Sequence, residues 1–428
     1  MSLAGRAEQA GGSRVVVTGL GAVTALGLDF DTSFAALLAG RSGVGPAPAA
    51  VLAATGGAIA AAVPDDFATR VPRAEVSFDR ATQLGLAAAR EAIVDAGLTD
   101  TAVDRGRVGI YAGIGMGGAQ IVEATMRDLA ARSLLGKPGA PASVHPLTVP
   151  RMMPNALCAW LSIEHGFRGP TCTYSVACAS SAVAIGEALR CIRHGYADAI
   201  VVVGAEALLS AGSFAAWNAL RVLAAPDAEA VAASHKPFDA RRSGFVLGEG
   251  SAALVLESAG HARRRGRSAY AGVAGYGTST DAHHITQPSR SGQAAAMDLA
   301  LHDSGLQPTE VGYLNAHGTA TPVGDVVETQ AIHDAFGAHA RRLAVSSTKS
   351  MHGHLIGAGG ALEFAISVKA LATGSIPPTA HLTQPDPACD LDFVPVAARH
   401  GQRLVAVMSN SFAFGGSNAA LLATHAER

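Results

Sequence analysis

Residues 171–198 read TCTYSVACASSAVAIGEALRCIRHGYAD. The first six residues have the length and apolar character of a strand, and the small and apolar residues that follow Cys178 are typical of a buried helix. Gly195 is a suitable helix end, and the apolar run Ala199–Gly204 predicts a strand that is buried on both faces. This segment therefore predicts a strand–helix–strand unit of an α/β protein.

Cys178 stands where the predicted strand gives way to the predicted helix. The free N–H groups and the positive dipole end of a helix N-terminus favour a thiolate, so we expect a lowered pKa for this thiol. Cys178 is therefore a candidate nucleophile. Most free cysteines are only packing residues, however. The small residues around Cys178, which are expected where another group approaches closely, favour the catalytic interpretation.

Length and composition restrict the class of protein. A chain of 428 residues predicts two to three domain-sized units, and 49 glycines with 49% hydrophobic residues favour a compact α/β enzyme. The net charge of −2 gives no reason to expect nucleic acid or an anionic membrane as partner. The 5 cysteines lack the paired spacing of a zinc site, which favours reduced thiols in the cytoplasm and no metal.

The N-terminal residues 1–13 resemble a disordered lead-in without an apolar signal core. No uninterrupted run of about eighteen apolar residues occurs, so we expect no membrane insertion. The stretch Val15–Val17 begins a strand, from which the glycine-rich residues Thr18–Gly27 are expected to turn away. This turn lacks the GxGxxG spacing and the lysine of nucleotide sites, so a nucleotide site is rejected.

Other elements alternate along the first half. The apolar spacing predicts helices at Asp79–Ala96 and Met152–His165 and a strand at Arg107–Gly113. The residues Gly40–Pro72, rich in Ala, Gly and Pro, are expected to form an irregular connection.

The second half of the chain repeats the first in outline. A helix ending in Asp-Ser-Gly-Leu at 303–306 precedes VGYLNAHG, as the earlier Asp-Ala-Gly-Leu at 95–98 precedes VGIYAG. A later strand, glycine-rich corner and long helix mirror the unit around Cys178. We place the boundary at a polar, basic segment, which gives an N-terminal half of residues 14–258 and a C-terminal half of residues 259–428.

Two histidines stand at element ends in this duplicated frame. His317 follows the strand in NAHGTAT, and His354 lies at the glycine-rich corner in SSTKSMHGH. Most of the 16 histidines are expected to be surface or core residues, but these two positions could face Cys178. A turn with paired glycines, NSFAFGGSN at 410–418, could bring a backbone N–H to a substrate oxygen, although it could also be a simple turn.

The motifs VACASS, NAHGTATPVGD, SSTKSMHGH and NSFAFGGSN, in this order, resemble the elongating β-ketoacyl-[acyl carrier protein] synthases, most closely synthase II. The resemblance covers nearly the whole chain. It implies the thiolase fold, in which two duplicated halves form a five-layer αβαβα sandwich, and a dimer. It also implies that an acyl carrier protein delivers the substrates.

The resemblance implies a role for each matching residue. Cys178 would take the acyl chain as a thioester, and His317 and His354 would bind the malonyl thioester carbonyl during decarboxylation. The backbone N–H groups of Cys178 and Phe414 would hold the acyl oxyanion, which is reasonable because donors stabilise charge where it develops. The remaining matches are a buried pair that organises the site (Lys349, Glu363), hydroxyls that bond the pantetheine arm (Thr319, Thr321), acyl-pocket positions (Met116, Trp217), a carrier-docking position (Arg221) and the gate at the pocket mouth (Phe414).

No metal or organic cofactor is implied, since the phosphopantetheine arm belongs to the carrier protein. The chain departs from the family pattern at Ala413, usually glycine, and at the two acyl-pocket positions, commonly Phe and Ile. Several basic residues expected on the carrier-docking face are also missing, which suggests a dedicated carrier or help from a partner subunit.

Other functions stay open. The chain could be a specialised ketosynthase of a type II polyketide or aryl polyene pathway, in a homodimer or in a heterodimer with a chain-length-factor-like subunit. A thiolase would need a second catalytic cysteine, for which Cys389 is badly placed. A non-catalytic chain-length partner should have lost the nucleophile, but Cys178 remains.

Overall fold

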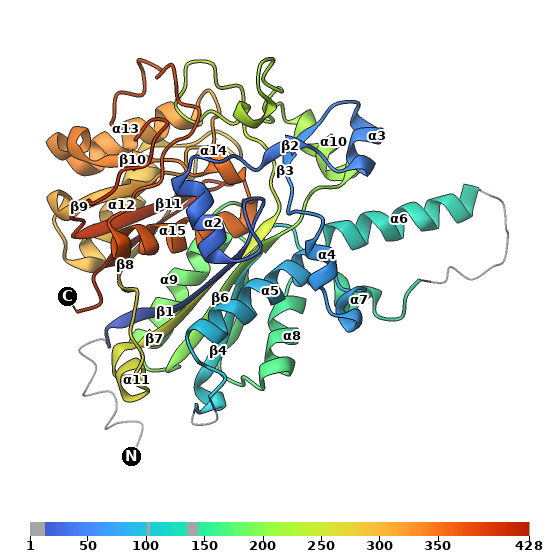
Figure 1. The fold of residues 1–428 in the computed structure, drawn as a ribbon, viewed down its shortest axis with the longest axis horizontal. Coiled ribbons are helices and arrows are strands. Elements are labelled where there is room, and N and C mark those ends of the chain that lie inside the picture. Colours follow the sequence, from blue (N-terminus) through green and yellow to red (C-terminus); the bar gives the residue numbers. More distant parts are fainter. Residues whose placement is uncertain (1–12, 101–102, 135–143, 428) are drawn as a thin grey trace.

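The computed structural model describes residues 13–100, 103–134 and 144–427 (Figure 1). Its main sheet has ten strands in the order β10-β9-β11-β12-β8-β1-β7-β6-β4-β5, and β2 and β3 form a separate pair. The strands are β1 (Val15–Val23), β2 (Val44–Pro46), β3 (Ile59–Ala61), β4 (Val108–Gly113), β5 (Thr171–Tyr174), β6 (Ala199–Glu206), β7 (Gly250–Ser258), β8 (Ala271–Thr280), β9 (Val311–Asn315), β10 (Ala344–Ser346), β11 (Ala406–Phe412) and β12 (Ser417–Thr424).

The predicted duplication appears in the strand pairing. In the first half, β1 pairs with β7 and β7 with β6 in antiparallel fashion, while β6–β4 and β4–β5 are parallel. In the second half, β8, β12, β11, β9 and β10 repeat this sequence of two antiparallel and two parallel pairings. A short antiparallel pairing of β1 with β8 joins the two halves. Each half is thus one copy of the same five-stranded unit.

The helices complete five layers. Helix α5 packs on β1, β7 and β6, and α12 packs on β8 and β12. Helices α9 and α15 touch each other and strands of both halves, so they form the middle layer. The helices are α2 (Phe30–Leu38), α3 (Ala49–Thr55), α4 (Phe67–Arg70), α5 (Arg80–Asp95), α6 (Ala119–Leu134), α7 (Thr148–Met152), α8 (Ala156–His165), α9 (Ser180–Arg193), α10 (Ala211–Ala219), α11 (Ala259–Arg264), α12 (Arg290–Ser304), α13 (Gly324–Phe336), α14 (Lys349–His352) and α15 (Gly359–Thr373). The expected αβαβα architecture is confirmed.

Small residues let the two middle helices meet at their N-terminal ends. A Cβ at Gly360 of α15 would lie 2.8 Å from the Cβ of Ala182 of α9. The Oγ of Ser181 accepts a hydrogen bond from the N–H of Ala361 at 2.8 Å. This close approach brings the corner that carries Cys178 to the corner in the second half.

Three local predictions were wrong. Strand β1 does not turn away at residue 18 but continues to Val23, and its glycines serve helix packing, since a Cβ at Gly19 would lie 2.2 Å from the carbonyl oxygen of Ala92. The connection Gly40–Pro72 contains short elements, namely β2, α3, β3 and α4. The helix expected at Met152–His165 ends at His165 but begins only at Ala156, as α8, because Met152 belongs to α7 and the ring of Pro154 interrupts the helical hydrogen bonds between them.

The segment Ile356–Thr373 has the length and apolar character of a membrane-spanning helix, but 83% of it is buried inside the protein. It is the central helix of the core. Of the expected lead-in, residues 1–12 lie outside the described residues.

Candidate active site

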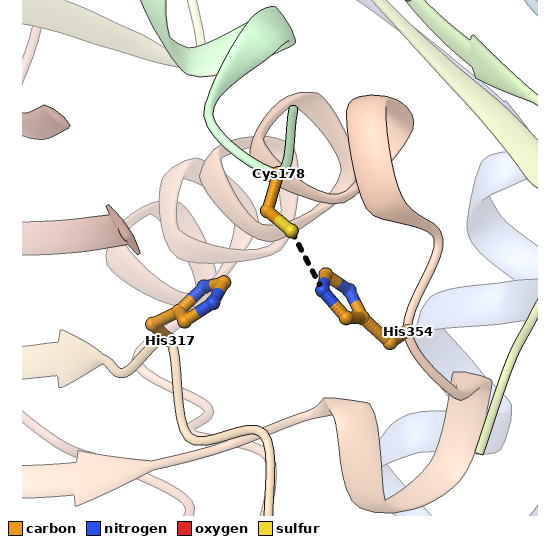
Figure 2. A group of neighbouring side chains, drawn as sticks. All are labelled: Cys178, His317 and His354. Carbon is orange, nitrogen blue, oxygen red and sulfur yellow. Dashed lines mark hydrogen bonds between the residues drawn. The ribbon is translucent and has the colours of Figure 1, made fainter. Parts of the chain in front are cut away.

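Cys178 lies between β5 and α9, two residues before the helix begins (Figure 2). The backbone of Ala177 has a φ of 46°, an unusual conformation for a residue other than glycine. Ser180 holds this turn, because its Oγ donates to the carbonyl oxygen of Ala177 at 2.6 Å and accepts from the N–H of Val176 at 2.8 Å. The turn aims the Cys178 side chain, which is only 7% exposed, away from its own helix and toward the second half.

His317 and His354 converge on this sulfur from the second half (Figure 2). The Nε2 atom of His354 lies 3.1 Å from the Cys178 Sγ. The two imidazole rings have centroids 5.5 Å apart at an interplanar angle of 83°. One donor atom from each of the three residues lies within 4.8 Å of the others. The fold thus assembles a thiol and two imidazoles from distant parts of the chain.

The backbone fixes the tautomer of His354. The N–H of Ile356 donates to its Nδ1 at 3.3 Å, so Nδ1 must be the unprotonated nitrogen and Nε2 carries the proton. The Nε2–H group therefore points at the sulfur as a donor. The Nδ1 of His317 is buried and has no hydrogen-bond partner among the described residues.

Burial dominates the protonation of the site. It raises the pKa of the Cys178 thiol to about 12, although the charge of Lys349 and the backbone N–H of Phe414 both lower it. The expectation that the helix N-terminus lowers the pKa of Cys178 is therefore wrong, because desolvation of the thiolate outweighs the nearby donors. Burial and the Lys349 charge also hold the pKa values of His317 and His354 well below the usual value, so both imidazoles are neutral near pH 7.

Lys349 and Glu363 form a buried ion pair, and the charge of its lysine acts on both histidines. The Lys349 Nζ lies 2.5 Å from the Glu363 Oε1, and both side chains are 1% exposed. Burial raises the pKa of Glu363 to about 7, against the opposing effect of the lysine charge. The pair comes from α14 and the first turns of α15, the elements on either side of His354.

Two further carboxylates, which sequence reasoning missed, hold the loop that carries His317. Glu328 of α13 accepts the N–H groups of His317 at 2.8 Å and of Gly318 at 2.7 Å, and Asp325 accepts the N–H of Ala320 at 3.0 Å. Asp325 is the last residue of the NAHGTATPVGD motif, so the motif itself could have indicated a role for this carboxylate.

A cavity of about 560 Å³ opens onto the three residues. Its lining includes Cys178, Trp217, Arg221, His317, Thr319, Thr321, His354 and Phe414 among the residues expected at the site. Thr319 and Thr321 share a hydrogen bond of 3.2 Å between their Oγ1 atoms. Met116 is not part of the lining and is 53% exposed, while Lys349 and Glu363 are buried and are not part of the lining either.

Aromatic rings crowd the wall next to the sulfur. The ring of Trp217 lies 5.6 Å from that of Phe245 and 6.1 Å from that of Phe414, measured between centroids. Phe245 in turn packs edge-on against the ring of His354 at 5.1 Å. The tryptophan and the gate residue therefore narrow the same part of the cavity.

Models of the β-ketoacyl synthase N-terminal and C-terminal domains match residues 12–262 and 270–383. The chain belongs to the β-ketoacyl synthase family. It is 40% identical over 412 residues to 3-oxoacyl-[acyl-carrier-protein] synthase 2 of Synechocystis sp., covering 95% of this chain and 97% of the relative. It is 39% identical over 413 residues to the synthase 2 of Staphylococcus aureus, covering 96% and 97%.

Solved ketosynthase structures have the same fold. A type II polyketide ketosynthase in complex with its acyl carrier protein superposes with a TM-score of 0.89 at 28% identity, covering 97% of this chain and 99% of that chain. The ishigamide ketosynthase/chain length factor gives 0.87 at 34% identity and the same coverage. A β-ketoacyl synthase from Burkholderia phymatum gives 0.85 at 36% identity, covering 96% and 99%.

Proposed function

We propose that the protein is a β-ketoacyl-[acyl carrier protein] synthase that joins a Cys178-bound acyl chain to a malonyl unit on an acyl carrier protein. The convergence of one thiol and two neutral imidazoles on a single cavity carries this proposal. The Cys178 sulfur displaces the carrier thiol from the acyl thioester. Malonyl then loses CO2, and the electron pair left on its α-carbon attacks the acyl carbonyl and releases the sulfur.

The donors around the cavity are suited to both steps. Decarboxylation places negative charge on the malonyl thioester oxygen, where the Nε2–H of His354 and an N–H of His317 would stabilise it. The backbone N–H groups of Cys178 and Phe414 both lower the pKa of the sulfur, and we assign them to the oxyanion of the acyl group. We assign the pantetheine arm to Thr319 and Thr321. Lys349 and Glu363 act as positioning residues.

We further propose that Arg221 helps to dock the carrier protein and that Trp217 limits the acyl chain. Met116 does not line the cavity within one chain, so any contact with the end of the acyl chain would come from outside this cavity. The protein would act in the cytoplasm, in keeping with five free cysteines, and as a dimer. Within each chain, the two duplicated halves would divide near residue 258. A thiolase is not supported, because Cys389 does not line the cavity.

A second candidate keeps the same chemistry on a polyketide or aryl polyene chain, with a chain-length partner in the dimer. Solved structures of similar ketosynthases support this second candidate. One contains a type II polyketide acyl carrier protein, and another contains a chain length factor. Acyl chain preference would separate the two candidates.

Intact-mass analysis tests the proposed function. After mixing with carrier proteins that bear acyl chains of several lengths and degrees of unsaturation, the wild-type protein should gain the mass of one acyl group. The Cys178→Ala variant should gain none. Cys172→Ala is the matched control, because Cys172 is exposed and does not line the cavity. Acylation that persists in Cys178→Ala would contradict the assignment.

A further inference from the structure

Gln293 lines the catalytic cavity and carries a buried polar atom that has no hydrogen-bond partner among the described residues. It lies in the first turn of α12, is 3% exposed and is part of the cavity lining. Its Oε1 atom is buried and accepts no hydrogen bond from the described residues. A buried acceptor without a partner is costly, so this carboxamide is arranged for a partner that enters the cavity.

Its polar neighbours on the same wall already have partners. The Nδ2 of Asn418 donates to the Oδ1 of Asp281 at 2.7 Å, and the N–H of Ser289 donates to the other oxygen of Asp281 at 2.9 Å. Glu328 accepts two backbone N–H groups of the loop that carries His317. The donors among these groups are already used, and the carboxylates of Asp281 and Glu328 accept hydrogen bonds and cannot donate to the Gln293 Oε1.

The chemistry of the wall restricts the ligand. Asp281 and Glu328 line the cavity together with Gln293, so an anionic group such as the malonyl carboxylate would meet other carboxylates there. A hydrocarbon chain would leave the Oε1 atom unpaired. The ligand that fits is therefore a neutral group with an N–H or O–H donor.

We propose that the Gln293 carboxamide binds a donor of the phosphopantetheine arm. This inference rests on the proposed function, in which three groups enter the cavity. Malonyl and a saturated or keto-bearing acyl chain offer no N–H, whereas the arm carries amide N–H groups and a hydroxyl. Thr319 and Thr321 come from the loop after β9, while Gln293 comes from α12, so the arm would be held from two separate elements.

The test compares acyl donors with and without the arm. Gln293→Met keeps the length of the side chain and removes the carboxamide. Gln287→Met is the matched control, because Gln287 is an exposed glutamine that lines the same cavity. The rate of Cys178 acylation is measured by intact mass, with an acyl-pantetheine and with the S-ethyl thioester of the same acid, which contains no N–H or O–H donor.

We expect Gln293→Met to lower the rate of acylation by acyl-pantetheine about tenfold and to leave the rate with the S-ethyl thioester unchanged. Gln287→Met should behave as wild type with both donors. An equal loss of rate with both acyl donors would show that Gln293 acts on Cys178 and not on the arm. An unchanged rate with acyl-pantetheine would show that Gln293 does not bind the arm. Either result overturns the inference. A wild-type protein that neither donor nor an acyl carrier protein acylates would instead overturn the proposed function.

Discussion

The Nε2 atom of His354 lies 3.1 Å from the sulfur of Cys178, and it carries the proton because the other ring nitrogen accepts from the N–H of Ile356. In this tautomer, His354 cannot take the proton of the thiol. It can donate a hydrogen bond to the sulfur or to a substrate oxygen in its place. The geometry therefore assigns His354 to the stabilisation of negative charge and not to general-base activation of the nucleophile.

Replacement of His317 should separate the two half-reactions. His317→Ala removes one donor to the malonyl thioester oxygen, so we expect malonyl decarboxylation to fall about 100- to 1,000-fold. Acyl loading of Cys178 should stay detectable by mass. His284→Ala, which removes an exposed histidine at the cavity mouth, is the control and should release CO2 from malonyl carrier protein at the wild-type rate. Undiminished decarboxylation in His317→Ala would count against the role.

The decarboxylation rate should be insensitive to pH near neutrality. Burial lowers the pKa values of His317 and His354 well below the usual value of 6.5, so both imidazoles stay neutral as the pH falls through 6.5. We therefore expect a flat rate from about pH 6 to about pH 8 and a loss only at more acidic pH. The rate of CO2 release across this range checks it. An inflection near pH 6.5 would show that a histidine with an ordinary pKa controls the step.

The Lys349–Glu363 pair should be important for stability as well as activity. Lys349→Met leaves a buried carboxylate without its partner, so we expect the free energy of unfolding to fall by about 3–5 kcal/mol. The double variant Lys349→Met with Glu363→Leu should recover much of this loss but not the activity. Denaturant unfolding measures both. Arg341→Ala, which breaks an exposed pair with Asp390, should cost less than about 1 kcal/mol. Equal losses in Lys349→Met and Arg341→Ala would contradict the role of burial.

Arg221 should affect carrier docking and not chemistry. Arg221→Ala removes a positively charged side chain from the cavity lining. We therefore expect the KM for carrier-bound substrates to rise several-fold and to depend less on salt concentration than in the wild-type protein. Acylation by acyl-pantetheine, which has no carrier protein, should not change. Steady-state kinetics at low and high salt provide the measurement. A similar loss with acyl-pantetheine would place Arg221 at the arm.

Removal of the Trp217 ring should widen the cavity beside the gate. The ring packs between Phe245 and Phe414, so Trp217→Ala is expected to favour long or bulky acyl chains over short ones. Competition between short and long acyl carrier proteins, read by intact mass, reports the change in preference. An unaltered preference for acyl chain length would show that the acyl chain lies against another wall of the cavity, away from Trp217.

The sequence by itself indicated two duplicated α/β halves and a candidate nucleophile, whereas the five-layer sandwich and the roles of the reacting groups came from the family resemblance. Alternating apolar segments, the repeated order of elements and the small residues around Cys178 all follow from local periodicity and close packing. The motifs also indicated His317 and His354, although nothing along the chain required them to meet the sulfur.

Only the tertiary structure decided how these groups behave. The pKa of Cys178 is raised because desolvation depends on every element that packs over the sulfur, not on the helix beside it. A backbone N–H two residues further along fixes the proton of His354, and backbone donors leave no mark in a sequence. Likewise, only the structure shows that the Oε1 of Gln293 is buried without a hydrogen-bond partner among the described residues. Protonation and hydrogen-bond partners arise from long-range burial, which a local pattern does not encode.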